Sequence, residues 1–474
     1  MADTHKLTRA AASAVLDKAL KYIDKNPEEN VIKLVDRASV MIRGMFPPEN
    51  FEKIKAGMRD PDNVYRQYAL DIIRDIDKRI IKNMILALGI EAAMYGTKTV
   101  RENREKYDCN IPWLILFDPT SACNLKCKGC WAAEYGHQQN LTYEEMQSIV
   151  SQGKALGTHF YMMTGGEPLI RKADIIRLCE ENPDCAFLAF TNGTLVDQKL
   201  CDDMLRVGNF GLALSIEGTE ESNDARRGGG TYSRTIEAME LLKKNKCLFG
   251  ISVCYTRQND EYVTSDAFLD LMVEKGVKFG FYFNYMPVGH DADKNFIPTP
   301  EQRKYMYDWI RRVRNGKTGK RMFIFDFQDD GEYVGGCIAG GRRYFHINSA
   351  GDMEPCVFIH YSDSNIRTHT ILEALRRPLF MAYCKGQPFN DNHLRPCPML
   401  ENPQLLRKMV KETGAKSTDL LVEEDVDTLC GRCDEFALEW APVAEELWNS
   451  RPHKKTHTEY YRDRHPEEFT NSGN

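Results

Sequence analysis

In the sequence WLILFDPTSACNLKCKGC, residues 113–130, a short apolar run leads directly into a loop with three cysteines. The run Trp113–Phe117 is typical of a buried β-strand. The loop then places Cys123, Cys127 and Cys130 four and three positions apart. A structural tetrahedral metal site has four protein ligands. Three thiols in one loop therefore indicate a metal centre with one open position.

Short β-rich runs and amphipathic helical patterns alternate beyond this stretch. Five further runs follow the first: Phe160–Met163, Phe187–Phe190, Gly211–Ser215, Gly250–Tyr255 and Phe279–Phe283. Repeated strand-then-helix units predict an α/β fold with a parallel sheet, here curved into a partial (βα)6 barrel. In such folds the chemistry lies at the carboxyl ends of the strands, where the cysteine loop begins.

The regions that flank this core differ from it in residue composition and pattern. We predict a helical region at 1–105, the barrel at 106–329, a cysteine-rich domain at 330–440 and a polar tail at 441–474. The apolar stretch Ile80–Tyr95 is broken by Lys82, Asn83 and Glu91. It is apolar enough to lie on a membrane or line an acyl groove, although such a helix more often packs on its own domain.

Composition narrows the class of protein. The chain has 474 residues, 42% hydrophobic and 28% charged, with a net charge of −6. This negative net charge does not favour binding to nucleic acid. The first residues lack the apolar core of a secretory signal, and no run is long enough to span a membrane. We therefore expect a cytoplasmic protein, with association at the cytoplasmic membrane face as an alternative.

The chain has 15 cysteines, an odd number, which argues against a disulfide framework. Five of them lie in apolar or helical contexts and are interpreted as packing residues: Cys179, Cys185, Cys201, Cys247 and Cys254. The context of Cys109 is ambiguous. The triple Cys123, Cys127 and Cys130 instead suits a 4Fe–4S cube with one iron left free for a ligand. The alternatives are a zinc site completed by His137 and unligated buried thiols.

The CxxxCxxC loop after the first strand resembles the signature of the radical S-adenosylmethionine (SAM) superfamily. Later strand ends resemble that family in order and spacing: TGGEP (Thr164–Pro168), TNGT (Thr191–Thr194), SIEGT (Ser215–Thr219), NDARRGGGTY (Asn223–Tyr232) and YMPVG (Tyr285–Gly289). The resemblance implies that these loops bind SAM, through Gly165, Gly166, Glu167, Thr191, Asn192, Ser215, Glu217, Arg227, Val253 and Met286. Arg226 is the alternative to Arg227, and either arginine could instead be an exposed loop residue.

One position departs from the family pattern. The family has an aromatic residue before the last cysteine of the loop, to contact adenine, whereas this chain has Gly129 followed by Trp131. Either Trp131 substitutes or the contact is looser. The resemblance implies reductive cleavage of SAM by the cluster, with Cys123, Cys127 and Cys130 as its ligands, and hydrogen abstraction by a 5′-deoxyadenosyl radical.

A second group of cysteines follows the barrel. The segment CIAGGRRYFHINSAGDMEPC, residues 337–356, resembles the opening of the SPASM or twitch extension, including a β-hairpin turning at Ser349–Gly351. The resemblance implies at least one auxiliary 4Fe–4S cluster, with ligands from Cys337, Cys356, Cys397, Cys430 and Cys433 and with Cys384 in reserve. A structural zinc and unligated thiols are the alternatives.

The sequence offers more than one class of substrate. The wide apolar faces of the first helices and the sequence of the cysteine loop, CNLKCKGCWAAEYG, favour lipid chemistry, with carbon–carbon bond formation on an acyl chain. The branch of the superfamily linked to membrane-spanning bacterial lipids looks most similar. A peptide-modifying maturase and a non-catalytic iron–sulfur carrier are the alternatives. The expected partners are SAM, a reductant such as ferredoxin or flavodoxin, the substrate lipid or peptide, and a membrane contacted peripherally through the first helices.

Overall fold

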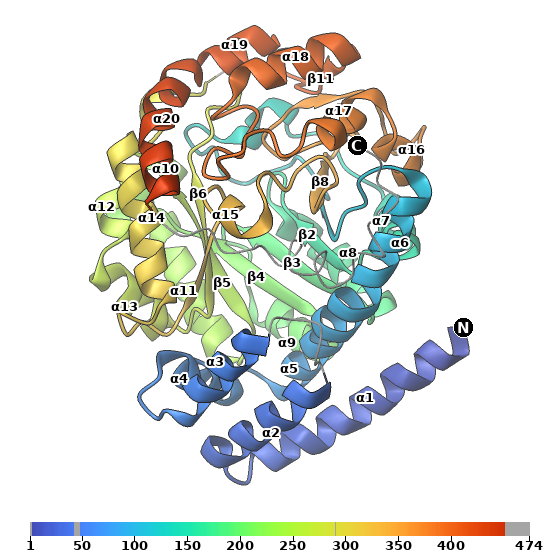
Figure 1. Cartoon of the computed structure of the whole chain (residues 1–474), viewed down its shortest axis with the longest axis vertical. Helices are drawn as coiled ribbons and strands as arrows, with labels where there is room; N and C mark the ends of the chain where they lie inside the picture. Colours follow the sequence, from blue (N-terminus) through green and yellow to red (C-terminus); the bar gives the residue numbers. More distant parts are fainter. Residues whose placement is uncertain (1, 42–47, 290, 451–474) are drawn as a thin grey trace.

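The structure is a computed structural model that describes residues 2–41, 48–289 and 291–450. Its first part is helical, as predicted: α1 (Ala2–Ile23), α2 (Pro27–Met41), α3 (Pro48–Arg59), α4 (Val64–Asp75), α5 (Lys78–Met84), a π-helical segment η1 (Ile85–Gly96) and α6 (Thr97–Tyr107). In Figure 1 α1–α3 lie at the end of the molecule opposite α18 and α19.

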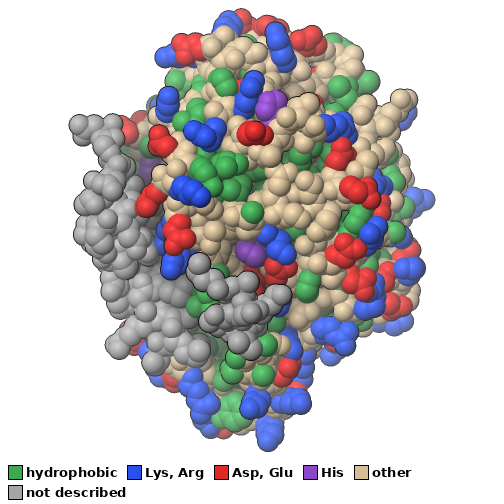
Figure 2. Space-filling view, turned by 90° about the vertical axis from the view of Figure 1, so that its right-hand side faces the viewer, with side chains coloured by type: hydrophobic (Ala, Val, Ile, Leu, Met, Phe, Trp, Pro, Cys, Tyr) green, Lys and Arg blue, Asp and Glu red, His purple; other side chains and the backbone are tan. Residues whose placement is uncertain are grey.

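The apolar stretch Ile80–Tyr95 packs mainly on its own domain. Ile80, Leu86 and Ala92 are buried, and the Trp113 indole donates to the Ala92 carbonyl at 3.2 Å. Of its large side chains, Ile85 is among the most exposed, at 41%. Among the described residues no helix is long and apolar enough to cross a membrane. The face seen in Figure 2 carries acidic and basic side chains interspersed, so neither sign dominates it.

A nine-stranded sheet forms the centre of the molecule, in the order β7-β6-β5-β4-β3-β2-β1-β8-β9 (Figure 1). The six predicted strands are all present and parallel: β1 (Leu114–Phe117), β2 (Phe160–Met163), β3 (Ala186–Thr191), β4 (Phe210–Ser215), β5 (Phe249–Tyr255) and β6 (Phe279–Asn284). They confirm the partial barrel.

Two further parallel strands extend the sheet beyond these six. β7 (Phe323–Asp326) pairs with β6, and β8 (Tyr344–Ile347) pairs with β1. The predicted hairpin is also confirmed, because β8 turns into the antiparallel β9 (Met353–Glu354). The cysteine-rich part of the chain therefore begins inside the sheet, next to the strand that leads into the cysteine loop.

Helices cover the outer face of the sheet: α7 (Tyr143–Leu156), α8 (Lys172–Glu181), α9 (Gln198–Val207), α10 (Glu220–Arg227), α11 (Thr231–Lys244), α12 (Asp260–Val263), α13 (Asp266–Lys275) and α14 (Pro300–Arg314). Local chemistry fixes their ends. Thr142 and Glu145 form a capping box at the start of α7, and Gly157 ends that helix in a left-handed conformation. Short 3₁₀ turns complete this part: η2 (Trp131–Tyr135), η3 (Pro168–Arg171) and η4 (Lys294–Phe296).

Most of the last part of the chain covers the inner face of the sheet, whereas Ile371, Ala374 and Leu375 pack in the core of the outer face. The elements of this part are α15 (Gly331–Val334), α16 (Ile371–Leu375), α17 (Pro378–Gly386), α18 (Pro403–Thr413), α19 (Val426–Gly431), α20 (Asp434–Asn449) and the strands β10 (Tyr361–Ser362) and β11 (Lys416–Ser417). Leu116, Met162 and Leu188 share one apolar core with Trp440 and Cys430. Helix α20 crosses the predicted boundary at 440, and residues 451–474 of the predicted tail lie outside the described residues.

Candidate active site

The cysteine loop is anchored at both of its ends. Ser121 N donates to the Gln139 carbonyl at 2.9 Å near its start, and Lys128 N donates to the carbonyl of Arg226, at the end of α10, at 2.9 Å. All three cysteines, Cys123, Cys127 and Cys130, are partly exposed. The loop therefore holds its thiols at the carboxyl edge of the sheet, as the sequence predicts.

The surroundings of Cys123 and Cys130 oppose ionisation of these two thiols unless a cation is present. Burial, and then the nearby charges of Glu167 and the other loop cysteines, raise the pKa of Cys123 to about 11. Burial also raises the pKa of Cys130, with a further contribution from Cys127. A cationic iron–sulfur core would compensate this clustered negative charge.

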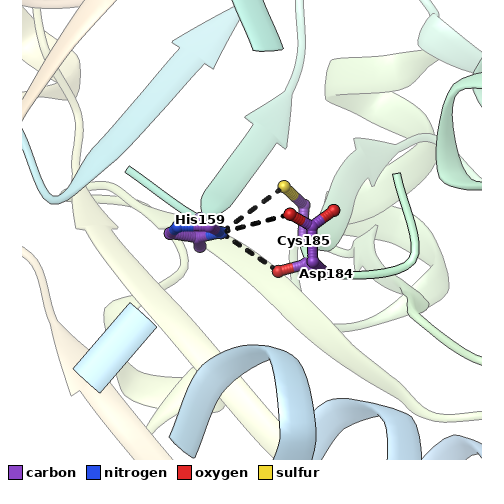
Figure 3. Close-up of side chains that lie close together, drawn as sticks. All are labelled: His159, Asp184 and Cys185. Atoms are coloured by element: carbon purple, nitrogen blue, oxygen red, sulfur yellow. Dashed lines mark hydrogen bonds and ion pairs between the residues drawn. The ribbon is translucent and has the colours of Figure 1, made fainter. Parts of the chain in front are cut away.

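The loop does not have the spacing of a single-ion site. Among the described residues, one group of three metal-ligating side chains has all its ligand atoms within 4.8 Å of one another, and it is His159, Asp184 and Cys185 (Figure 3). That group precedes β2 and β3, at the opposite end of the strands, and Lys154 Nζ already donates to Asp184 at 2.8 Å. His137, the ligand of the zinc alternative, instead lies 3.3 Å from the Ser121 carbonyl. The wider sulfur spacing suits a cluster better than zinc.

The TGGEP loop crosses the cysteine loop at very short range. A Cβ atom on Gly166 would lie 2.2 Å from the Ala122 carbonyl, and one on Gly165, whose φ is +105°, would lie 2.6 Å from that of Thr120. The two backbones are joined where Glu167 N donates to the Ala122 carbonyl at 2.8 Å. The glycines are thus required for contact between the two loops, before any contact with a ligand.

Glu167 joins the ends of β2 and β3. Its buried carboxylate accepts from the Thr191 hydroxyl at 2.7 Å and from Asn192 N at 2.8 Å. Asn192 in turn donates to Asn124 of the cysteine loop at 2.9 Å. Burial raises the pKa of Glu167, although these donors oppose the shift. The structure therefore brings Glu167, Thr191 and Asn192 together beside the cysteines.

A second buried carboxylate lies at the end of β4. Glu217 Oε1 accepts from Arg226 Nη1 at 2.5 Å and from Arg227 Nε at 2.8 Å. Its other oxygen, Oε2, is buried and has no hydrogen-bond partner among the described residues. Both arginines also interact electrostatically with Cys127 of the loop. An unpaired acceptor beside two cations and the cysteine loop suits a polar ligand such as SAM. Ser215 lies on the same strand end, partly exposed.

The ends of β5 and β6 place the remaining predicted residues. Val253 points into the core between sheet and helices, whereas Cys254, next to it, packs on the inner side. Met286 is buried, with its sulfur accepting from Gln328 at 3.6 Å. The ring of Tyr285 fills the space over Gly129, where a Cβ atom would lie 2.6 Å from the tyrosine hydroxyl.

Trp131 lies on the other side of the loop. Its ring contacts those of His346 at 5.9 Å, His360 at 6.1 Å and Phe358 at 6.2 Å, measured between centroids. In this structure, Tyr285 therefore provides the aromatic ring next to position 129, and Trp131 faces the cysteine-rich part of the chain.

A buried charge network that the sequence analysis missed adjoins the loop. His346 of β8 is 2.9 Å from Asp118, at the end of β1, and 2.6 Å from Glu354 of β9. Tyr135, in the turn after Cys130, donates to Glu354 at 2.8 Å and stacks on His360. Each of these residues is an ordinary polar position in the sequence, and the parallel pairing of β1 with β8 was the missing signal.

The second set of cysteines is gathered in one core. Cys356, Cys430 and Cys433 are buried there, with Cys337 and Cys397 packed against it. Nearby cysteine charges contribute to the raised pKa values of Cys356, Cys397 and Cys433 after burial, the largest cause in each case. Cys384 lies elsewhere, beside Cys109 and Arg104. The five proposed ligands are therefore neighbours, and the reserve residue is separate from them.

Comparison with known proteins identifies the class. Residues 117–269 match the Radical SAM superfamily. An AdoMet-dependent heme synthase of Methanosarcina barkeri is 24% identical over 290 residues, which are 56% of this chain and 82% of that protein. Mycofactocin maturase MftC of Mycolicibacterium smegmatis is 27% identical over 264 residues, 52% of this chain and 65% of its own length. The crystal structure of Streptococcus suis SuiB shares the fold, with a TM-score of 0.51, 18% identity and coverage of 62% and 72%.

The chain is therefore a radical SAM enzyme. It uses a 4Fe–4S cluster and SAM, and its cysteine-rich extension is similar to the SPASM or twitch extension, with at least one auxiliary cluster. The residues around the first loop fit these cofactors, because they provide three clustered thiols, two buried carboxylates and an unpaired acceptor.

Proposed function

We propose that the enzyme abstracts hydrogen from an unactivated carbon of an apolar substrate, an acyl chain of a lipid, as a step toward carbon–carbon bond formation. Cys123, Cys127 and Cys130 are proposed to hold the catalytic cluster. Cys337, Cys356, Cys397, Cys430 and Cys433 supply the ligands of the auxiliary cluster. The proposed working units are the helical region 1–105, the core 106–329 and the auxiliary domain 330–440.

When bound, the cluster and SAM supply a 5′-deoxyadenosyl radical, given one electron from a low-potential donor such as ferredoxin or flavodoxin. The chain's own residues position that chemistry. Arg226 and Arg227 provide fixed positive charge beside Cys127, and Glu217 Oε2 provides an acceptor for a ligand ammonium or hydroxyl. Glu167 fixes the strand ends that surround the SAM site.

The aromatic lining of the barrel's inner face is the observation that supports an apolar substrate. Along β6, Tyr282 points outward onto Trp309 of α14, so the alternate residues Phe281 and Phe283 point inward. Both are only partly buried, and Phe325 on β7, stacked on Phe281 at 4.7 Å, is 39% exposed. Partly exposed rings on the inner face of a barrel are the surface that an apolar ligand would cover.

This lining leads to the cysteine loop. Phe190 contacts Phe283 at 5.8 Å, Phe283 contacts Phe358 at 6.4 Å, and Phe358 contacts Trp131, which follows Cys130. Small residues line the neighbouring strands: Gly211 and Ala213 on β4, and Gly250 and Ser252 on β5. An extended hydrocarbon chain could lie along the rings with one of its carbons near the loop.

A second candidate substrate is a peptide, favoured by the relation to mycofactocin maturase MftC. A peptide backbone would need hydrogen-bonding groups along its path, and the aromatic wall offers few. Peripheral membrane contact would use the few exposed side chains of the apolar stretch Ile80–Tyr95, such as Ile85 and Met94, since most of the stretch packs on the domain itself. A cytoplasmic location stays a prediction.

The test compares lipid extracts of an anaerobic host that expresses the wild type or Cys127→Ala. We expect new coupled or functionalised acyl chains in the wild type alone, detected by mass spectrometry. An unchanged lipid profile together with a modified peptide would replace the lipid with the peptide substrate. Formation of 5′-deoxyadenosine by the purified enzyme is measured in parallel, so that loss of the cofactor chemistry is distinguished from a wrong substrate.

A further inference from the structure

Tyr383 has a buried hydroxyl group that finds no hydrogen-bond partner among the described residues. The residue lies on α17, and none of its surface is exposed. Its ring is held in place by an edge contact with Phe389 at 5.2 Å and by Gly340, on which a Cβ atom would lie 2.4 Å from that of Tyr383. A fixed, buried hydroxyl without an acceptor is costly, so it indicates a missing partner.

The surroundings of this residue show what the partner is. Tyr383 lies in the same buried core as Cys356, Cys430 and Cys433, against which Cys337 and Cys397 also pack. Gly340, which contacts Tyr383, donates its N–H to the carbonyl of Pro355, the residue before Cys356, at 2.8 Å. The hydroxyl is therefore buried in the core that contains the five proposed auxiliary ligands, and a phenol hydroxyl can donate to a sulfur there.

A second tyrosine shows the same chemistry at this site. The Tyr344 hydroxyl lies 2.7 Å from Cys356 Sγ, approaching from β8. The auxiliary site thus already has one phenol on a ligand sulfur. Tyr383 differs in that no sulfur or oxygen of the described residues accepts its proton, although the proposed ligand cysteines share its core.

We propose that the Tyr383 hydroxyl donates a hydrogen bond to a sulfur of the auxiliary 4Fe–4S cluster and so raises the reduction potential of that cluster. The proposal depends on the auxiliary assignment made above and not on the identity of the substrate. Reduction places more negative charge on the cluster sulfurs, so a donor stabilises the reduced state more than the oxidised state. Tyr383 would thereby set how readily the auxiliary cluster takes an electron.

The test is a redox titration of the loaded enzyme and its Tyr383→Phe variant, followed by electron paramagnetic resonance. We expect the midpoint of the auxiliary cluster to become more negative. At the wild-type midpoint potential, the oxidised-to-reduced ratio should rise about tenfold, which corresponds to 59 mV for one electron. The potential of the catalytic cluster should stay unchanged. The Cys127→Ala background isolates the auxiliary signal.

Tyr282→Phe is the matched control, because it removes a hydroxyl bonded to the Val263 carbonyl in the outer core. It should leave both potentials unchanged. An unshifted auxiliary midpoint in a fully loaded Tyr383→Phe protein would overturn the proposal. Loss of auxiliary iron in that variant would also overturn the proposal, since the hydroxyl would then be a cluster ligand. Zinc in place of the auxiliary cluster would overturn it as well.

A second measurement needs no variant. Transfer of the wild type into D₂O should shift the iron–sulfur stretching bands of the auxiliary cluster, because a hydrogen bond from an exchangeable hydroxyl ends on it. The Tyr344 hydrogen bond contributes to that shift, so Tyr344→Phe should keep part of it. A shift that disappears entirely in Tyr344→Phe would contradict a role for Tyr383. SAM cleavage and lipid products are separate readouts, so failure here leaves the proposed function standing.

Discussion

The perturbation His346→Gln tests the buried charge network that joins the barrel to the cysteine-rich extension. His346 is fully buried between Asp118 and Glu354. Burial alone lowers the pKa of the imidazole, but the charges of the two carboxylates and their hydrogen bonds raise it to about 10. The residue is therefore a cation at neutral pH. Glutamine keeps an amide for hydrogen bonding but loses the charge.

The magnitude follows from that pKa. A rise from the ordinary value of 6.5 to about 10 corresponds to about 5 kcal/mol of stability. Because the folded-state pKa is the higher one, this contribution is complete below pH 6.5 and is lost as the pH rises toward 10. Burial raises the pKa of Asp118, so protonation of that carboxyl relieves part of the loss in the variant. We expect His346→Gln to lower the free energy of unfolding by about 3–5 kcal/mol at neutral pH.

The assay is anaerobic urea unfolding between pH 6.5 and pH 10. The stability of the wild type should fall across this range, and that of His346→Gln should be lower at the start and change less. Asp118→Asn combined with His346→Gln should cost less than the sum of the single changes, because no unpaired carboxylate remains at Asp118. His369→Gln, whose partner is the exposed Thr368 hydroxyl, is the control and should change little. A His346→Gln protein within about 1 kcal/mol of the wild type, without altered pH dependence, would show that the buried imidazolium does not stabilise the fold.

The remaining predictions concern the two clusters, the SAM loops and the inner face of the barrel. Cys127→Ala should abolish SAM cleavage and remove the catalytic cluster's signal, whereas Cys430→Ala should retain part of the iron; equal iron loss in both would show that the two-cluster assignment is wrong. Glu167→Ala should weaken SAM binding at least tenfold with the catalytic cluster intact, because the donors of Thr191 and Asn192 lose their acceptor. Undiminished affinity, measured by equilibrium binding, would contradict that role. Phe281→Glu should leave 5′-deoxyadenosine formation in the absence of substrate unchanged but abolish the lipid product, and a retained product would contradict an apolar substrate path.

Local patterns account for what the sequence predicted well. The six strands, the cysteine loop and the helix caps depend on short-range signals, and the structure has each strand within a residue of its predicted limits. The hairpin of β8 and β9 was equally local. These local elements are sufficient to identify the class of enzyme, because the three loop cysteines directly follow the first strand.

Long-range pairing explains what the sequence could not predict. β8 pairs with β1 although the two strands are separated in the sequence by the whole barrel, and only that pairing brings His346 to Asp118, 228 positions away. The side of the loop on which Trp131 lies, and the placement of Tyr285 over Gly129, depend in the same way on contacts between distant segments. A sequence shows that these aromatic residues exist, but the packing determines which of them lies next to the cluster loop.

The proposed chemistry requires that Cys123, Cys127 and Cys130 hold a 4Fe–4S cluster with one iron free for SAM. Mössbauer spectroscopy of the reconstituted protein, with and without SAM, tests it most directly. We expect SAM to alter the signal of a single iron site, and Cys127→Ala to abolish this change. Zinc in the loop, or a cluster whose iron sites are all unaffected by SAM, would show that no iron is open to SAM.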